Sequence, residues 1–109
     1  MVVLVTGATS GIGKQTAIEF AKHGYNLVIT GRRKERLIEL KKDIETNYKV
    51  DVLDLCFDIT IQKEVEHAVH SLSGKFQNID ILINNAGFLV SGIAEETPIV
   101  MGRKQLETN

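Results

Sequence analysis

The sequence holds one cysteine, one proline and no tryptophan among its 109 residues. A single cysteine, Cys56, excludes an internal disulfide and a cysteine-rich metal site, and we expect it to be a small core residue. The scarcity of proline argues against a disordered or linker-rich chain. No apolar run approaches the roughly 20 residues that a membrane-spanning helix needs, and nothing at the start is typical of a signal peptide. We therefore expect a cytoplasmic protein without a membrane partner.

The chain also lacks an excess of either charge. Its 13 basic and 14 acidic side chains give a formal net charge of -1, which provides no reason to expect a nucleic-acid partner. Hydrophobic residues make up 43% and charged residues 25%, as is ordinary for a globular chain. The length then predicts one domain that spans residues 1–109.

Short apolar runs alternate with segments of helical periodicity along the chain. Strands are expected at 2–5, 27–30, 50–57 (near a sheet edge) and 79–83. Between and after them, apolar residues recur every three or four positions and predict helices. Thr60 is expected to cap the third helix, which would reach Phe76, and Thr97-Pro98 to begin a fourth. The alternation predicts an α/β fold, a doubly wound parallel sheet with helices on both faces.

Three glycines occupy the turn after the first strand, in the segment Thr6-Gly7-Ala8-Thr9-Ser10-Gly11-Ile12-Gly13. Glycine permits a tight turn and a close approach of the backbone to a ligand, and the helix start that follows attracts phosphate. The spacing is not Gly-x-Gly-x-x-Gly, because position 16 is Thr. It is not a P-loop either, because Lys14 is followed by Gln15. The turn is predicted to bind a pyrophosphate; the alternative is a turn that only permits helix–strand packing.

This turn, together with Asp58 and the segment Asn84-Asn85-Ala86-Gly87, resembles the classical short-chain dehydrogenase/reductase superfamily in its amino-terminal part. The resemblance implies a Rossmann-type fold of four strands in the order 3-2-1-4, with residues 79–83 at an edge. It also implies that the chain is truncated after the helix that follows the fourth strand. The cofactor contacts that it implies are Gly7, Ser10, Gly11, Ile12, Gly13, Asp58, Asn84, Ala86 and Gly87.

The residues after the second strand favour NADP(H) over NAD(H). Gly31 stands where NAD-preferring members of the family carry Asp, and Arg32 stands where many NADP-preferring members carry a basic residue. A guanidinium binds a 2′-phosphate through charge-assisted hydrogen bonds, whereas an acid repels it. Arg32 and Arg33 are therefore predicted to hold that phosphate; alternatively, both are solvated residues at a helix start. Asp58 is predicted to accept a hydrogen bond from the adenine amine; alternatively, it is a residue at the entry to the helix that follows Thr60.

The proton donor of the family, a Tyr followed four residues later by a Lys, has no counterpart in these residues. Four positions after Tyr25 and Tyr48 stand Ile29 and Val52. The family's catalytic Ser is also missing, and only Asn109 aligns with a catalytic residue, as a positioning group. We therefore expect the chain alone to be inactive.

The resemblance implies a parent oxidoreductase, a homo-oligomer, that transfers hydride between NADP(H) and a small carbonyl or hydroxyl substrate. Segments 30–37 and 78–82 look like those of members that act on small 3-hydroxy acids. Two alternatives stay open: a non-catalytic dinucleotide-binding or interaction module, and an incomplete gene product without independent activity. His67 and His70 are expected on a partly exposed helix face, and no metal site is predicted.

Overall fold

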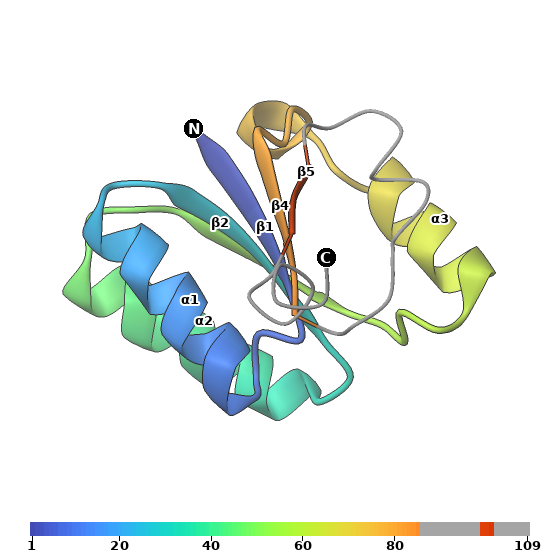
Figure 1. The fold of residues 1–109 in the computed structure, drawn as a ribbon, viewed down its shortest axis with the longest axis horizontal. Coiled ribbons are helices and arrows are strands. Elements are labelled where there is room, and N and C mark those ends of the chain that lie inside the picture. The colour runs from blue at the N-terminus through green and yellow to red at the C-terminus, as the bar shows by residue number, and fades with distance from the viewer. Residues whose placement is uncertain (86–98, 102–109) are drawn as a thin grey trace.

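A computed structural model describes residues 1–85 and 99–101 of the chain. Strands and helices alternate in it as the sequence pattern predicts (Figure 1). The elements are β1 (Val2–Thr6), α1 (Gly11–Lys22), β2 (Asn26–Gly31), α2 (Lys34–Asn47), β3 (Val52–Cys56), α3 (Gln62–His70), the 3-10 helix η1 (Gly74–Phe76), β4 (Ile81–Asn84) and β5 (Ile99–Met101).

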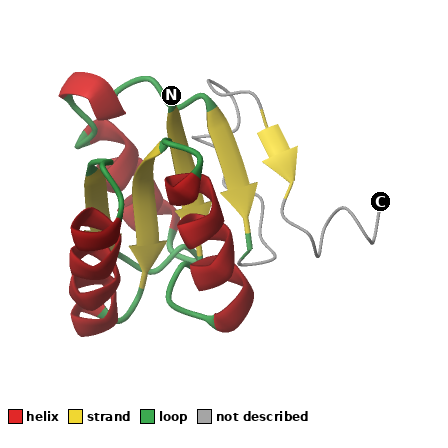
Figure 2. Ribbon diagram, turned by 90° about the vertical axis from the view of Figure 1, so that its left-hand side faces the viewer, coloured by secondary structure: helices red, strands yellow, loops and turns green. Residues whose placement is uncertain are grey.

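The strands form one parallel sheet in the order β3-β2-β1-β4-β5. At its centre Leu4 pairs with Val28 of β2 on one side and with Leu82 of β4 on the other. Figure 2 shows the strands side by side with helices in front of them and behind. The predicted order 3-2-1-4 and the edge position of β3 are therefore confirmed, and β5 extends the sheet.

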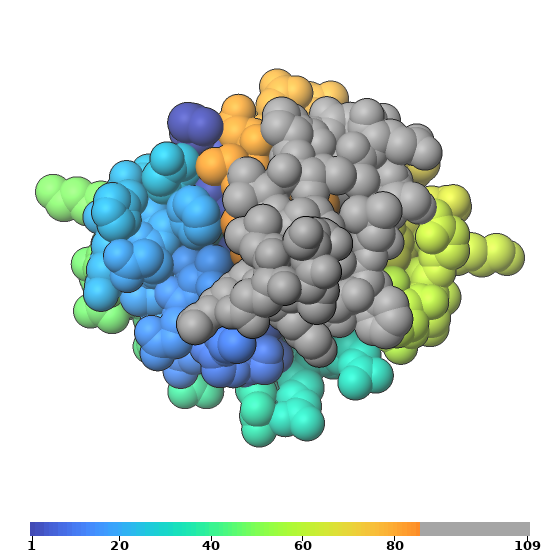
Figure 3. Space-filling model, in the orientation of Figure 1, coloured from blue at the N-terminus to red at the C-terminus, as the bar shows by residue number. Residues whose placement is uncertain are grey.

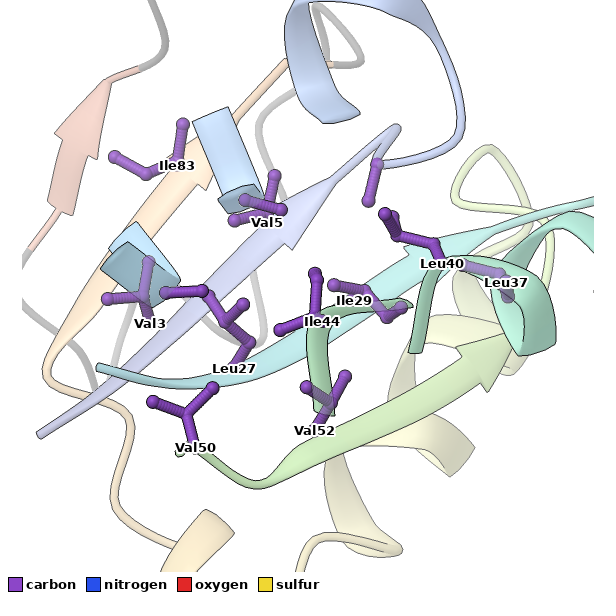
Figure 4. Packing of buried hydrophobic residues seen from close by; sticks show 13 residues of the cluster. Val3, Val5, Leu27, Ile29, Leu37, Leu40, Ile44, Val50, Val52 and Ile83 are labelled. Atoms are coloured by element: carbon purple, nitrogen blue, oxygen red, sulfur yellow. The ribbon is translucent and has the colours of Figure 1, made fainter. Parts of the chain in front are cut away.

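Both faces of the sheet are covered, which explains why its inner strands are apolar without interruption. Val3 and Val5 of β1 belong to the core cluster under α1 and α2, whereas Val2 and Leu4 belong to the cluster on the α3 side. This alternation follows from the two-residue repeat of a strand. Figure 4 shows the first cluster, in which Leu37, Leu40 and Ile44 of α2 lie beside β2 and β3.

The structure corrects two predictions about the end of the sheet. Ile99–Met101 forms β5, parallel to β4, where the sequence predicts a helix begun by Thr97-Pro98. The β-branched Ile99 and Val100 suit a strand, and their pairing satisfies backbone groups that an exposed edge would leave unpaired. β4 is therefore an interior strand and not the predicted edge. Thr97, Pro98 and the rest of the predicted helix lie outside the described residues.

Three further corrections concern the segment from Cys56 to Phe76. Thr60 does not cap this helix, whose N-cap is Ile61; the Thr60 hydroxyl donates instead to Asp58 Oδ1 at 2.6 Å, because an Asp side chain readily closes a turn two residues on. The helix ends at His70, and Phe76 reaches the core from η1. Cys56 is exposed and not a core residue, because it ends an edge strand.

Candidate functional site

The loops that follow β1, β2 and β3 meet at the carboxyl end of the sheet, at the lower side of Figure 1. They enclose a cavity of about 380 Å³, lined by residues of the glycine turn, by Thr30 to Arg33, by Phe57 to Thr60, and by Arg36. Ligands of open parallel sheets bind at this end, outside the strand termini. Figure 3 shows the start of α2, in teal, protruding at the lower rim of the molecule.

The glycines of the first turn serve three different purposes. Gly7 has φ +61°, a left-handed conformation that side chains rarely adopt. A Cβ on Gly13 would lie 2.0 Å from the carbonyl oxygen of Gly7, so this position cannot carry a side chain without moving the turn. A Cβ on Gly11 would meet nothing within 4 Å. Backbone conformation therefore explains Gly7 and packing explains Gly13, but neither explains Gly11, whose bare backbone leaves room for a ligand.

The start of α1 suits an anion. Its N-cap residue, Ser10, makes no side-chain capping bond; its hydroxyl donates to the carbonyl oxygen of Gly7 at 3.0 Å instead. The first turn of α1 contains no acidic residue. The first N–H groups of the helix are therefore left for a ligand, and the helix dipole favours a negative one.

Three guanidinium groups line the cavity, from Arg32, Arg33 and Arg36. Among residues 1–85, Asp58 is the one acidic residue that lines it, and its Oδ2 lies 3.9 Å from Arg32 Nη1. Within residues 1–85, neither Arg33 nor Arg36 forms an ion pair. The positive charge of the cavity thus exceeds its negative charge, and a phosphate would compensate it.

Hydrogen bonds with Thr60 and with Glu64 of α3 hold Asp58 in place. Its Oδ1 accepts hydrogen bonds from the hydroxyl of Thr60 at 2.6 Å and from the backbone N–H of Thr60 at 2.9 Å. Its own N–H donates to Oε1 of Glu64 in α3 at 3.0 Å. The two bonds from Thr60 hold the pKa of Asp58 below its usual value, and the Arg32 guanidinium lowers it further. Asp58 is therefore a fixed, ionised hydrogen-bond acceptor at the rim of the cavity.

Asn84 lies at the end of β4 and is fully buried. Its Oδ1 accepts a hydrogen bond from the Thr6 hydroxyl at 2.9 Å, which joins the ends of β4 and β1. Its Nδ2 has no partner among the described residues, and neither does Nδ2 of Asn85. A buried amide donor without a partner is uncommon, so the end of β4 retains capacity to bind a ligand.

Five of the residues predicted from the sequence line one cavity: Gly7, Ser10, Arg32, Arg33 and Asp58. Gly11 and Ile12 lie in the exposed first turn of α1, and Gly13 is buried beneath it. The sequence analysis missed Arg36, although its position three residues after Arg33 in a predicted helix would have placed both on one side.

Other predicted features stand apart from this cavity. Ala86, Gly87 and Asn109 lie outside the described residues. His67 and His70 are exposed on α3, and in residues 1–85 no three His, Cys, Asp or Glu side chains are grouped to hold a metal. None of the helices in this part of the chain is long and apolar enough to cross a membrane.

A glycine turn between β1 and α1, at the carboxyl end of a parallel sheet covered on both faces, defines a dinucleotide-binding domain of Rossmann type. The cavity beside this turn, with its surplus of guanidinium groups, fits the same class. The chain belongs to the short-chain dehydrogenase family, because the family model described as short chain dehydrogenase matches residues 1–109.

Relatives with assigned activities support this membership. The chain is 44% identical over 86 residues to an NADP-dependent 3-hydroxy acid dehydrogenase of Schizosaccharomyces pombe, which covers 78% of this chain and 33% of the relative. It is 38% identical over 108 residues to a serine 3-dehydrogenase of Rhizobium radiobacter, which covers 98% of this chain and 42% of the relative. The chain thus spans less than half the length of either protein.

A solved structure shows the same fold. The L-sorbose reductase of Gluconobacter frateurii, crystallised with NADPH and L-sorbose, superposes with a TM-score of 0.74 at 37% sequence identity. The match covers 80% of this chain and 33% of the reductase. The predicted Rossmann-type architecture is therefore confirmed.

Proposed function

We propose that this chain binds NADP(H) in preference to NAD(H), with the 2′-phosphate of the adenosine in the cavity at the carboxyl end of the sheet. The observation that carries the proposal is the charge of that cavity, which three arginines and one aspartate line within the described part of the chain. Gly31 supports it, because a Cβ there would lie 3.3 Å from Thr9 Cγ2 and 3.5 Å from Leu37 Cδ2. An acidic side chain at this position, which would favour NAD(H), would therefore require Thr9 to shift by a few tenths of an ångström.

Each predicted residue has a role in this proposal. Gly7, Ser10, Gly11, Ile12 and Gly13 form the turn and the helix start that receive the pyrophosphate. Arg32 and Arg33 hold the 2′-phosphate, and Asp58 accepts a hydrogen bond from the adenine amine. Asn84 contributes its unpartnered amide at the end of β4, followed by Ala86 and Gly87.

The arginine role is tested by titrating the chain with NADPH and with NADH, with the fluorescence of the reduced nicotinamide as signal. A charge-assisted hydrogen bond contributes about 1.5–3 kcal/mol, so Arg32→Gln should weaken NADPH binding roughly ten- to a hundredfold. NADH binding should change little. Lys22→Gln, which removes the same charge at the far end of α1, is the control. Equal losses for both cofactors in Arg32→Gln would contradict the assignment.

The parent reaction that we propose is transfer of hydride between NADP(H) and a small carbonyl or alcohol substrate. The bound cofactor would supply the hydride to a carbonyl as NADPH, or accept it from an alcohol as NADP⁺. The relatives named above, a 3-hydroxy acid dehydrogenase and a serine 3-dehydrogenase, favour a small 3-hydroxy acid as substrate. In the whole protein Asn109 would serve as a positioning residue. Oxidation of serine and of 3-hydroxypropionate with NADP⁺ by the whole protein tests the substrate class; activity only on substrates without a carboxylate would contradict it.

A second candidate function is cofactor binding without turnover. Neither Tyr25 nor Tyr48 is followed by a Lys four positions later, so these 109 residues carry a cofactor site without the family's proton donor. The pure chain is then expected to bind NADPH and leave it unoxidised when a small keto acid is added. Sustained NADPH oxidation by the pure chain would refute this second reading.

A further inference from the structure

Arg36 lies at the boundary between two cavities. It lines the cavity of about 380 Å³ described above, and it also lines a second one of about 220 Å³ that opens between α1 and α2. Thr9 lines both as well. Arg36 thus lines the first cavity from α2, whereas Arg32 and Arg33 line it from the segment between β2 and α2.

The position of Arg36 in the helix is electrostatically unfavourable in the absence of an anion. It is the third residue of α2, and Arg33 is the N-cap residue of the same helix. A spacing of three residues places the two side chains on the same side of the helix. Positive charges at a helix start oppose the helix dipole, so an anion bound between them would relieve both their mutual repulsion and that opposition.

Arg36 also forms no ion pair within residues 1–85 that would hold its side chain away from the first cavity. Glu39 and Asp43 line the second cavity with it, yet within residues 1–85 no ion pair joins Arg36 to either of them. Arg32, by contrast, lies 3.9 Å from the Asp58 carboxylate. Of the two, Arg36 is therefore the one without an ion-pair partner among residues 1–85.

We propose that Arg36 is a third ligand of the 2′-phosphate and a determinant of the selectivity for NADP(H) over NAD(H). This inference rests on the proposed function, because it assigns one more residue to the same phosphate. Arg32 lies within ion-pair distance of Asp58. Arg33 and Arg36 form no ion pair within residues 1–85, so their two positive charges match the two negative charges of a phosphate dianion. Arg36 contributes to this site from α2, and Asp58 lines the same cavity.

The test uses ligands that lack the nicotinamide, so that binding is measured apart from catalysis. Isothermal titration calorimetry compares 2′,5′-ADP, 5′-AMP and inorganic phosphate on the unchanged chain and on Arg36→Gln. We expect Arg36→Gln to bind 2′,5′-ADP about tenfold more weakly, the effect of one charge-assisted hydrogen bond, and to bind 5′-AMP as before. Arg36→Lys should lie between the two, because it keeps the charge but loses the planar fork.

Lys34→Gln is the matched control, since it removes one positive charge from the first turn of the same helix, and Lys34 does not line the cavity. It should leave 2′,5′-ADP binding within about twofold, as expected for a solvent-screened charge. Circular dichroism melting of each variant establishes that the fold is retained. Because Arg36 is exposed, its replacement should not change the melting temperature.

The outcomes separate this inference from the proposed function. If the unchanged chain binds 2′,5′-ADP no better than 5′-AMP, the proposed NADP(H) preference itself is wrong. If it prefers 2′,5′-ADP and Arg36→Gln keeps that preference, or loses affinity for both ligands equally, the role of Arg36 is refuted. Inorganic phosphate that binds as tightly as 2′,5′-ADP would show a general phosphate site and would also overturn the assignment.

Discussion

The two glycines at the start of α1 allow a sharp test, because the same substitution should have opposite effects two residues apart. In Gly13→Ala the new Cβ would lie 2.0 Å from the carbonyl oxygen of Gly7 and 2.8 Å from its carbonyl carbon. Both contacts are with backbone, so the turn or the helix must shift. Overpacking of this kind costs about 1–3 kcal/mol, and we expect Gly13→Ala to lower the free energy of unfolding by that amount.

In Gly11→Ala the new Cβ would meet no atom of the chain within 4 Å. Alanine favours a helix over glycine by up to about 1 kcal/mol, so the stability should stay unchanged or rise slightly. The cost appears in binding instead, because this Cβ occupies the space through which a pyrophosphate would approach the helix start. We expect Gly11→Ala to bind NADPH more weakly than the unchanged chain while it melts at the same or a higher temperature.

Thermal unfolding followed by far-ultraviolet circular dichroism measures the pair. For a domain of this size 1 kcal/mol corresponds to about 4–8 °C, so Gly13→Ala should melt roughly 4–24 °C lower. Urea unfolding of the same samples gives the free energies directly. If Gly13→Ala melts with the unchanged chain, the contact between Gly13 and Gly7 is not as tight as the structure has it. If Gly11→Ala is the less stable variant, the division of roles between the two glycines is wrong.

Three further predictions follow from the hydrogen bonds and contacts of the site. Thr6→Val removes the buried donor to Asn84 Oδ1 and should lower the free energy of unfolding by about 1–3 kcal/mol, measured by urea unfolding; no change would refute the importance of this bond. The pKa of Asp58 is lowered, so its ionisation stabilises the fold above the pKa of an unfolded Asp, and this contribution disappears as the pH falls through the lower folded pKa. Thr60→Val should raise the pKa of Asp58 toward its usual value, as measured by NMR titration of the carboxyl carbon. The free energy of unfolding should then depend less steeply on pH on the acid side. An unchanged pKa would show that the Thr60 hydroxyl is not the main cause of the lowered pKa. Gly31→Asp should weaken NADPH binding more than NADH binding in fluorescence titrations, because the new carboxylate lies beside the phosphate site; equal losses would point to the contact with Thr9 alone.

Most of the fold could be predicted because it depends on local patterns. The apolar runs, the helical periodicity of α1 and α2, and the glycine turn between β1 and α1 each reflect residues that are close in sequence. The positions of Arg32 and Asp58 could be predicted for the same reason, since each directly follows a strand whose end is apparent. Parallel strands then bring these separate ends to one edge of the sheet.

The features that the sequence did not reveal depend on what lies beside each segment in space. Ile99–Met101 pairs with β4, and nothing in its own sequence indicates that partner. Cys56 is apolar enough for a core, but it ends the edge strand β3 and is exposed. Thr60 has the right chemistry for a helix cap, yet Asp58 competes for its hydroxyl. Arg36 lies in a charged helix face that is typical of solvated surface, and only the cavity distinguishes it.

Asn84 shows how one side chain can serve both the architecture and the ligand. Its oxygen is engaged with Thr6, which fixes the ends of β1 and β4 relative to one another. Its nitrogen, equally buried, has no partner among the described residues. A buried amide donor without a partner costs free energy, so an acceptor that binds at the end of β4 would gain this hydrogen bond. The bond from Thr6 fixes the orientation of the amide and therefore of its nitrogen. The turn at Gly7 to Gly13 divides the two roles that we propose between separate residues: a Cβ on Gly13 would meet the backbone of Gly7, whereas a Cβ on Gly11 would meet nothing within 4 Å.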